Sequence, residues 1–422
     1  MTVSTGPRAV RGASSRASSP ASVHLAFPRT RAPHVLLGIA ALCSIGARAR
    51  AQTVLGYGED ASAAPVGAIR VRLSNDWHRS SASGVGNDTT YDTDRQSRTS
   101  LIGLEVGVLK RFSVGVSIPW VTTKALTFVS SQHPQGLVLD TLLDTSHNGW
   151  GNIEALAKVV WLGEAGQEAR LDPHDGVHVR SALVGGALLG TGIRIDPRDP
   201  FAIGTSDRAK AAVVESATDL TVGKHFFGSL VGRYEKPMSD NVLVAVHPGG
   251  NPFANDAVPF AAERKLGTRY EIVATPRYQF SRHFAVGLQY RYHHGAQNHF
   301  VGTTTVDVGN ETVTLDASTL DAGTELTEQR VGFGAVYSAV EAYTRNRSRI
   351  PVEVTFEYSK VVSISNNLPK ESEVVFAVRI FHRLWGAEFA PPAMPVKQPA
   401  LEPAAPPPVP PPVPPPVTSP KP

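Results

Sequence analysis

The sequence predicts an all-β fold, an antiparallel up-and-down transmembrane β-barrel of about 12 strands with a disordered Pro-rich tail. Apolar and polar residues alternate in many segments, as in Phe284-Ala-Val-Gly-Leu-Gln-Tyr-Arg-Tyr292. Only a strand places alternate side chains on opposite faces. These segments run for about ten residues, the length that crosses a bilayer at a tilt. Their connections alternate between short and long, as they do in membrane barrels.

The N-terminal region has the composition of a cleavable leader. Residues 1–58 contain no Asp or Glu, arginines precede the apolar run 35–45, and Ala49-Arg-Ala51 supplies a small-x-small exit. This order predicts a secretory signal peptide over residues 1–51, with a buried core helix as the alternative. The apolar run is too short to span a membrane. Leu42 stands before Cys43 where lipidation would need a small residue, so a lipoprotein is disfavoured.

Removing the leader changes the charge of the chain. The full sequence carries a formal charge of +4, but seven of its 41 basic residues lie in residues 1–51. The mature chain therefore has 34 basic against 37 acidic residues, a formal charge of −3. No nucleic-acid partner is expected, because no basic stripe with interleaved aromatics follows. The single cysteine leaves with the leader, which excludes disulfides and Cys-based metal or redox sites.

The remaining chain divides into three parts. Residues 52–66 are expected to form an N-terminal linker, and residues 67–386 the barrel. Residues 387–422 are dominated by proline with Ala and Val. Proline cannot donate to ladder or helix hydrogen bonds, so this tail should be polyproline II or disordered and lie outside the barrel, in the periplasm.

The first five predicted strands each present one apolar face. Only Arg111-Phe112 separates the second from the third, which is hairpin spacing. The fifth alternates poorly around Gly185-Gly186. In chain order these strands are 68–78, 101–110, 113–122, 152–162 and 177–189.

The other seven predicted strands include the weakest and the clearest patterns. The sixth and seventh are short and could be one longer strand, which would change the count. The eighth and ninth are joined by the tight turn Ser281-Arg-His283. The last three alternate strictly, as in Val352-Glu-Val-Thr-Phe-Glu-Tyr358. In chain order these strands are 218–224, 228–236, 269–280, 284–293, 328–338, 351–360 and 373–385.

The connections alternate in length, with a modest last one at 361–372. Short turns on one side and long loops on the other are typical of barrels that span a bacterial outer membrane. The shorter connections are 111–112, 163–176, 225–228, 281–283 and 339–350. The longer ones are 79–100, 123–151, 190–217, 237–268 and 294–327.

The apolar faces could point to lipid or to the core of a soluble, secreted β-sandwich. Sandwich strands are usually about five or six residues long, shorter than the segments here. The polar faces carry Gly, Ser, Thr, Arg and Glu of both charge signs, as a barrel lumen does. Aromatic residues gather near strand ends, where interfacial girdles lie, and lipid is therefore favoured. They are Trp77, Trp120, Trp161, Tyr270, Tyr278, Tyr292, Tyr337, Tyr358 and Trp385.

Three segments carry a family resemblance over about residues 51 to 385. They are Lys110-Arg-Phe-Ser-Val-Gly-Val-Ser-Ile-Pro119, Tyr278-Gln-Phe-Ser-Arg-His-Phe-Ala-Val-Gly287 and Val374-Val-Phe-Ala-Val-Arg-Ile-Phe-His-Arg-Leu-Trp385. With them the chain resembles Gram-negative outer-membrane β-barrel proteins and, more loosely, the outer-membrane transporters grouped with the meta-pathway of phenol degradation.

The resemblance implies where the protein resides and what it contacts. It implies the cell outer membrane, reached by secretion across the inner membrane, with outer-membrane lipid around the barrel. It also implies that barrel-assembly machinery recognises the last strand. Here a Pro-rich tail follows that strand instead of the chain terminus, which departs from the usual pattern. Peptidoglycan or a periplasmic protein is the partner expected for this tail.

The sequence gives no sign of an enzyme or a cofactor. Gly-x-Ser-x-Gly, His-Glu-x-x-His and phosphate-loop motifs are absent. Charges on the polar strand faces favour mutual ion pairing over acid/base catalysis, because buried charges need partners. The carboxylates are Glu105, Glu154, Glu271, Glu353 and Glu357; the arginines are Arg180, Arg269, Arg277, Arg291, Arg330 and Arg379.

Two groups could be read as metal sites. His293-His294 with His299 lacks a carboxylate or thiol at ligand spacing, so a position at the base of a loop is preferred. Asp88, Asp92 and Asp94 miss the spacing of a helix–loop–helix calcium site and its closing Glu. A solvated acidic loop is therefore the favoured interpretation, with calcium as the alternative.

The function expected is a passive channel or carrier for small solutes through a charged, narrow lumen. The alternative is a closed structural or adhesive barrel that acts through its long loops or its tail. A barrel hydrolase is a third class, disfavoured by the missing nucleophile motif. The residues expected to line the lumen are Arg269, Glu271, Arg277, Arg291, Arg330, Glu353, Glu357 and Arg379.

Overall fold

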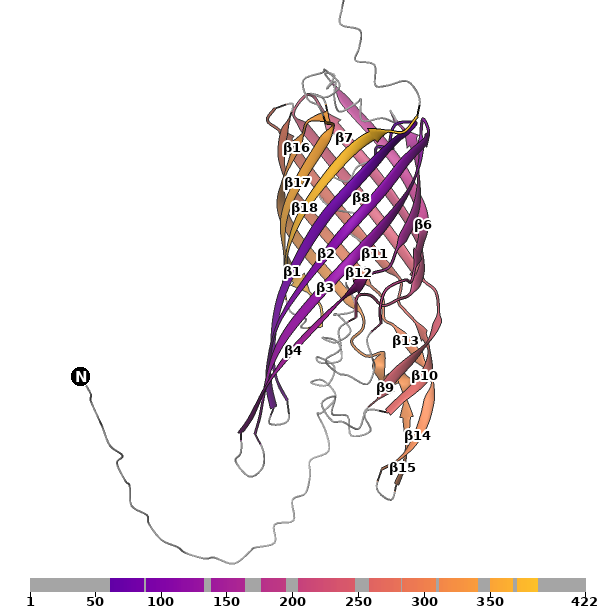
Figure 1. The fold of residues 1–422 in the computed structure, drawn as a ribbon, viewed down its shortest axis with the longest axis vertical. Coiled ribbons are helices and arrows are strands. Elements are labelled where there is room, and N and C mark those ends of the chain that lie inside the picture. The colour runs from indigo at the N-terminus through magenta and orange to yellow at the C-terminus, as the bar shows by residue number, and fades with distance from the viewer. Residues whose placement is uncertain are drawn as a thin grey trace, which may run out of the picture.

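Twelve antiparallel strands close into a barrel, as the sequence predicts (Figure 1). The computed structural model describes residues 61–86, 89–132, 138–163, 176–194, 204–246, 258–281, 283–308, 311–340, 350–366 and 370–385. The predicted signal peptide and Pro-rich tail lie outside the described residues. The barrel strands are β1 (Ala68–Gly86), β2 (Thr89–Leu109), β3 (Phe112–Gln132), β5 (Glu154–Leu162), β6 (Val177–Leu189), β7 (Lys210–Val222), β8 (Phe226–Pro237), β11 (Arg269–Gln279), β12 (Phe284–Gly295), β16 (Leu326–Ser338), β17 (Val352–Ile364) and β18 (Glu371–Arg383).

The barrel closes where its first and last strands meet. β1 pairs with β18 from Ala68↔Arg383 to Ser80↔Glu371 and with β2 on its other side. Each remaining strand pairs with its neighbours along the chain, and β3 continues to β5. Both uncertain strands, the sixth and seventh, are present as β7 and β8, so the predicted count holds.

Alternate side chains of each strand face opposite sides of the wall. β7 alternates strictly between exposed and buried positions, and its exposed positions include Val214 and Leu220. The inward positions include Glu215 and Asp219, both buried. An apolar outer surface around a partly charged interior is the arrangement of a barrel in lipid. Among the described residues, no helix is long and apolar enough to cross a membrane.

The ladder between β11 and β12 is interrupted at one point. Pairing runs from Arg269 to Ala274 and resumes at Arg277↔Gly287. On its other edge β11 stays paired with β8 through Thr275 and Pro276. Proline has no N–H to donate, so Pro276 accounts for a gap on one edge of the strand.

Many residues in the connections that were predicted to be long loops form β-strands. We call the end of the barrel that carries these segments the long-loop end, and the opposite end the short-turn end. β1, β2 and β3 run beyond the barrel at the long-loop end, and β4 (Val138–Trp150) pairs with the extension of β3 (Figure 1). Expecting loops at 79–100 and 123–151 was wrong, because segments such as 79–83 and 144–148 are polar at nearly every position and carry no hydrophobic alternation.

The long connections 237–268 and 294–327 form a small β structure at the same end. Its buried cluster includes Val242, Val244, Phe260, Ala262 and Leu315. These connections were expected to be loops; short strands with few alternating positions give little periodic signal. The elements are β9 (Asp240–Val246), β10 (Val258–Lys265), β13 (His299–Val301), β14 (Thr303–Val308), β15 (Glu311–Asp316) and the 3₁₀ turn η1 (Ala317–Leu320).

Candidate functional site

The interior of the barrel is the candidate site. Two of the eight residues expected to line it, Arg269 and Glu271, are half-buried where β11 begins at the long-loop end. The other six are buried at inward positions of the wall: Arg277, Arg291, Arg330, Glu353, Glu357 and Arg379.

A carboxylate joins the arginines of β12 and β16. Arg291 and Arg330 stand opposite each other in register, a like-charge pair that would be destabilising alone. Glu373 Oε2 accepts hydrogen bonds from Nη1 of both, at 3.1 Å from Arg291 and 2.6 Å from Arg330. Ser359 Oγ donates to the same oxygen at 3.2 Å. Glu373 was not among the residues expected to line the lumen.

Further carboxylates surround the same two guanidinium groups. Arg291 lies 3.3 Å from Glu271 and 3.6 Å from Glu357. Arg330 lies 3.2 Å from Glu328 and 3.0 Å from Glu371. In a separate pair, Arg379 Nη1 donates to Glu353 Oε1 at 2.9 Å. We call the part of the wall formed by β12, β16, β17, β18 and β1 the charged wall.

The opposite part of the wall, β5–β8 and β11, carries contiguous apolar side chains, and we call it the apolar wall. One cluster includes Val160, Ala182, Ala217, Val231 and Val273. A second contains Leu188, Ala211 and Val213, with Leu156 packed against it. Apolar side chains at inward positions can contact the apolar part of a solute.

One arginine of the apolar wall forms ion pairs with three carboxylates. Arg233 on β8 lies 2.5 Å from Glu154 on β5, 2.8 Å from Glu235 and 3.8 Å from Glu215. β8 and β5 are not neighbours in the barrel, so the Arg233–Glu154 pair connects strands through the interior. The residues expected to line the lumen did not include Arg233, although it alternates with outward Tyr234 in the predicted strand 228–236.

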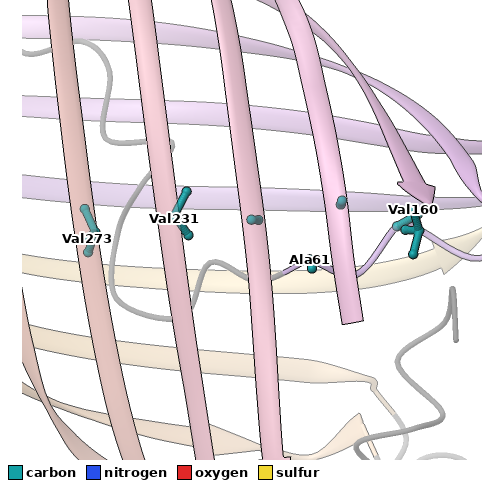
Figure 2. Packing of buried hydrophobic residues seen from close by; sticks show 7 residues of the cluster. Ala61, Val160, Val231 and Val273 are labelled. Carbon is teal, nitrogen blue, oxygen red and sulfur yellow. The ribbon is translucent and has the colours of Figure 1, made fainter. Parts of the chain in front are cut away.

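The chain before β1 lies inside the barrel. Ala61, Ser62, Ala63 and Ala64 are almost fully buried, and Figure 2 shows Ala61 among the strands that carry Val160, Val231 and Val273. Residues 52–66 were expected to form only a linker, because Ala61-Ser-Ala-Ala-Pro65 has no alternation and no chemical motif.

Buried charges bind the backbone of this segment. The Ala61 N–H donates to Asp219 Oδ2 at 2.9 Å, and Arg180 Nη2 donates to the same oxygen at 2.7 Å. Lys158 Nζ donates to the Ser62 carbonyl at 3.3 Å. The Ala64 N–H donates at 3.2 Å to Glu105 Oε1, and the Glu105 carboxylate is also paired with Arg70. Residues 61–65 therefore have specific partners that hold them across the lumen.

The interior also contains a small cavity and one buried polar side chain without a partner in the described part of the chain. A cavity of about 80 Å³ is lined by cationic, carboxylate and aliphatic side chains, among them Arg72, Glu215 and Val184. On the charged wall the side-chain amide of Gln289 is buried and has no hydrogen-bond partner in the described part of the chain. A buried amide without partners is costly, so it is a natural contact for a polar group passing through.

A polar network surrounds Asp207 at the long-loop end. Asp207 Oδ2 accepts from Arg269 Nη2 at 2.7 Å, and Oδ1 accepts from Asn152 Nδ2 at 3.0 Å. Arg264 donates to the Asp207 carbonyl and pairs with Asp240, both at 2.9 Å. Burial would raise the pKa of the Asp207 carboxyl, but the Arg269 charge and the Ala209 N–H together lower it below its ordinary value.

Neither suspected metal group gathers into a site. His294 Nδ1 contacts Thr327 Oγ1 at 3.0 Å, and His299 Nδ1 contacts Asp321 at 3.2 Å. Asp92 and Asp94 lie on strand β2, not in a loop, and Asp94 pairs with Arg79. Within the ranges that the structure describes, no group of three or more His, Cys, Asp or Glu could hold a metal ion. Asp88 lies outside the described residues.

The fold is similar to solved outer-membrane barrels. No family model matches the chain, and no curated protein matches it in sequence. The COG4313 outer membrane channel from Pseudomonas putida F1 is 14% identical, with a TM-score of 0.50 over 78% of this chain and 100% of that one. This likeness confirms the outer-membrane β-barrel fold expected from the sequence.

Two other solved structures are more distant. The translocator domain of the autotransporter NalP from Neisseria meningitidis is 10% identical, with a TM-score of 0.35 over 83% of this chain and 99% of that one. A FadL homologue from Pseudomonas aeruginosa is 9% identical, with a TM-score of 0.28 over 75% of this chain and 90% of that one.

Proposed function

We propose that the protein is a passive outer-membrane channel for small solutes that combine an apolar body with a polar or charged group. The observation that supports this proposal best is that one wall of the lumen is apolar and the opposite wall is charged. The apolar wall can contact the body of such a solute, while Gln289 and the arginines and glutamates of the charged wall contact its polar end. The likeness to a solved outer membrane channel agrees with this proposal.

Residues 61–65 would set the width of the path in this proposal. They cross the interior and are held by Asp219, Lys158 and Glu105. Ion pairs on both walls leave few unbalanced charges, so the path should show weak ion selectivity and low conductance. A solute would pass beside the segment or displace it.

Planar-bilayer conductance of the folded protein tests the proposal. The mature chain should show small, steady conductance, and a variant lacking residues 61–65 should show conductance several-fold larger. A variant lacking residues 391–422 is the matched control and should behave like the mature chain. Resistance of unboiled protein to unfolding on a denaturing gel would show that each variant is folded.

A closed structural barrel remains the second candidate, and a specific observation favours it. The Arg233–Glu154 pair connects non-neighbouring strands through the interior, and residues 61–64 fill part of the lumen. In that case neither the mature chain nor the variant without residues 61–65 would conduct, although both would fold. The protein would then act through its long-loop end or through the tail, for which a periplasmic partner or peptidoglycan is our proposal.

A further inference from the structure

A cationic surface lies on the outside of the barrel near the long-loop end. On β1 the outward side chains change from Leu73 to Trp77 and then Arg79. Lys124 follows Trp120 and Thr122 on the outer face of β3, and Lys360 follows Phe356 and Tyr358 on that of β17. Aromatic belts mark the level where the bilayer meets water. The three exposed cations therefore lie at the level of the lipid headgroups.

Strand register places these cations in one row, each two strands from the next. Lys360 pairs with Ser372, Ser372 with Arg79, Arg79 with Gln96, and Gln96 with Lys124, which forms one row across five neighbouring strands. In the adjacent row, Arg98 on β2 pairs with Trp77 on β1. Side chains of this region line an open groove of about 420 Å³: Trp77, Arg79, Arg98, Lys124, Ser372 and Val374.

Arg98 is oriented before any ligand binds. Its guanidinium lies 5.5 Å from the centroid of the Trp77 ring, within the range of a cation–π contact. Its Nε and Nη2 donate to Asn75 Oδ1 at 3.1 and 2.8 Å, and Ser100 Oγ donates to the same oxygen at 2.8 Å. Asn75 therefore accepts from two of the five N–H donors of the Arg98 guanidinium, and the other three are available to a ligand.

The surface has more cations than carboxylates. Arg79 pairs with Asp94 at 2.9 Å, and Lys124 with Asp144 at 3.4 Å; all four side chains are exposed. Exposed pairs contribute little, so an anion can displace them at small cost. Over the described residues, no carboxylate lies within ion-pair distance of Arg98 or Lys360.

We propose that this surface binds the phosphate groups of a phosphorylated lipid in the leaflet at the long-loop end. Arg98 makes the central contact, since a guanidinium can hold phosphate through two parallel N–H donors. Arg79 and Lys360 extend the site toward a second phosphate. The apolar part of the lipid lies along Trp77 and the aliphatic outer surface beyond it. Free phosphate would leave this apolar flank unused, so the occupant is a lipid.

Native mass spectrometry of the detergent-solubilised full mature barrel tests the proposal. The probes are bisphosphorylated lipid A, the same lipid with both phosphates removed, and inorganic phosphate. The bisphosphorylated lipid should bind, and Arg98→Gln should weaken its binding by about tenfold, the effect of losing a charge-assisted hydrogen bond. Arg98→Lys should restore part of the affinity, because it keeps the charge but loses the planar fork.

Lys110→Gln is the matched control. It removes an exposed positive charge from the turn between β2 and β3, at the opposite end of the strands that carry Arg98 and Lys124, and should leave lipid binding unchanged. Equal binding of the dephosphorylated lipid, or unchanged binding by Arg98→Gln, would overturn the proposal. Inorganic phosphate that binds as tightly as the lipid would also overturn it, by showing that the apolar flank takes no part.

Discussion

The two walls of the lumen are built from the same kind of strand but hold their interiors together differently. On the charged wall, Glu373 binds two arginines that face each other across a strand pair. The apolar wall has its own ionic network around Arg233, but beside it Val231 and Val273 pack with Ala61 and Ala63 through apolar contact alone. A buried ionic network fails abruptly when one member is lost, whereas apolar packing weakens in proportion to the volume removed.

The largest effect should come from Glu373→Gln. Removing the shared carboxylate charge leaves Arg291 and Arg330 opposed and buried, and breaking a buried pair costs about 3–5 kcal/mol. Urea unfolding of the barrel in lipid vesicles measures the loss. Glu371→Gln, at a side chain 28% exposed, is the control and should cost much less. Equal losses would contradict the distinction between buried and exposed members of the network.

A moderate effect is expected on the apolar wall from Val231→Ala. The substitution removes two methyl groups from the cluster that packs against Ala61. Each buried carbon contributes about 0.8 kcal/mol, so the free energy of unfolding should fall by about 1.5 kcal/mol. The same urea titration measures it. Leu230→Ala, at the neighbouring lipid-facing position, tests whether the loss comes from the interior. If Val231→Ala lowered the free energy of unfolding as much as Glu373→Gln does, the two walls would not differ.

The smallest effect should come from the Asp207 network, which joins β11 to the segment before β7 at the long-loop end. The folded pKa of Asp207 lies below its ordinary value of 3.8, so its contribution is present above that value and is lost as the pH falls through the folded pKa. Limited proteolysis at neutral pH and below pH 3.8 should show looser loops in acid. Asp207→Asn should give the looser pattern already at neutral pH; a wild-type pattern for this variant would contradict the assignment.

Most of the barrel could be predicted from the sequence because lipid imposes strict alternation. Segments such as Val352-Glu-Val-Thr-Phe-Glu-Tyr358 carry that signal, and even the weak sixth and seventh strands are present. The strand segments beyond the predicted ones could not be found in this way, since sequences such as Asp144-Thr-Ser-His-Asn148 have no hydrophobic alternation. The partners of the lumen charges depend on register and curvature, so neither Glu373 nor Arg233 was recognised as a central residue.

Residues 61–65 were missed for a different reason. Their side chains are small and their contacts go mainly through backbone N–H and C=O groups to Asp219, Glu105 and Lys158. Backbone groups are common to every residue, so the sequence contains no pattern that reveals such a segment. Only the partners of this segment carry a sequence signal, since they are charged residues at inward positions of β2, β5 and β7.

The pairing of β1 with β18 places a condition on biosynthesis. Until the final strand has been made, both edges of the unfinished sheet keep unpaired N–H and C=O groups, and such edges invite aggregation. A polypeptide truncated before residue 371 would lack the strand that seals the cylinder. It should therefore accumulate as a substrate for proteases, not as a smaller working version of the protein.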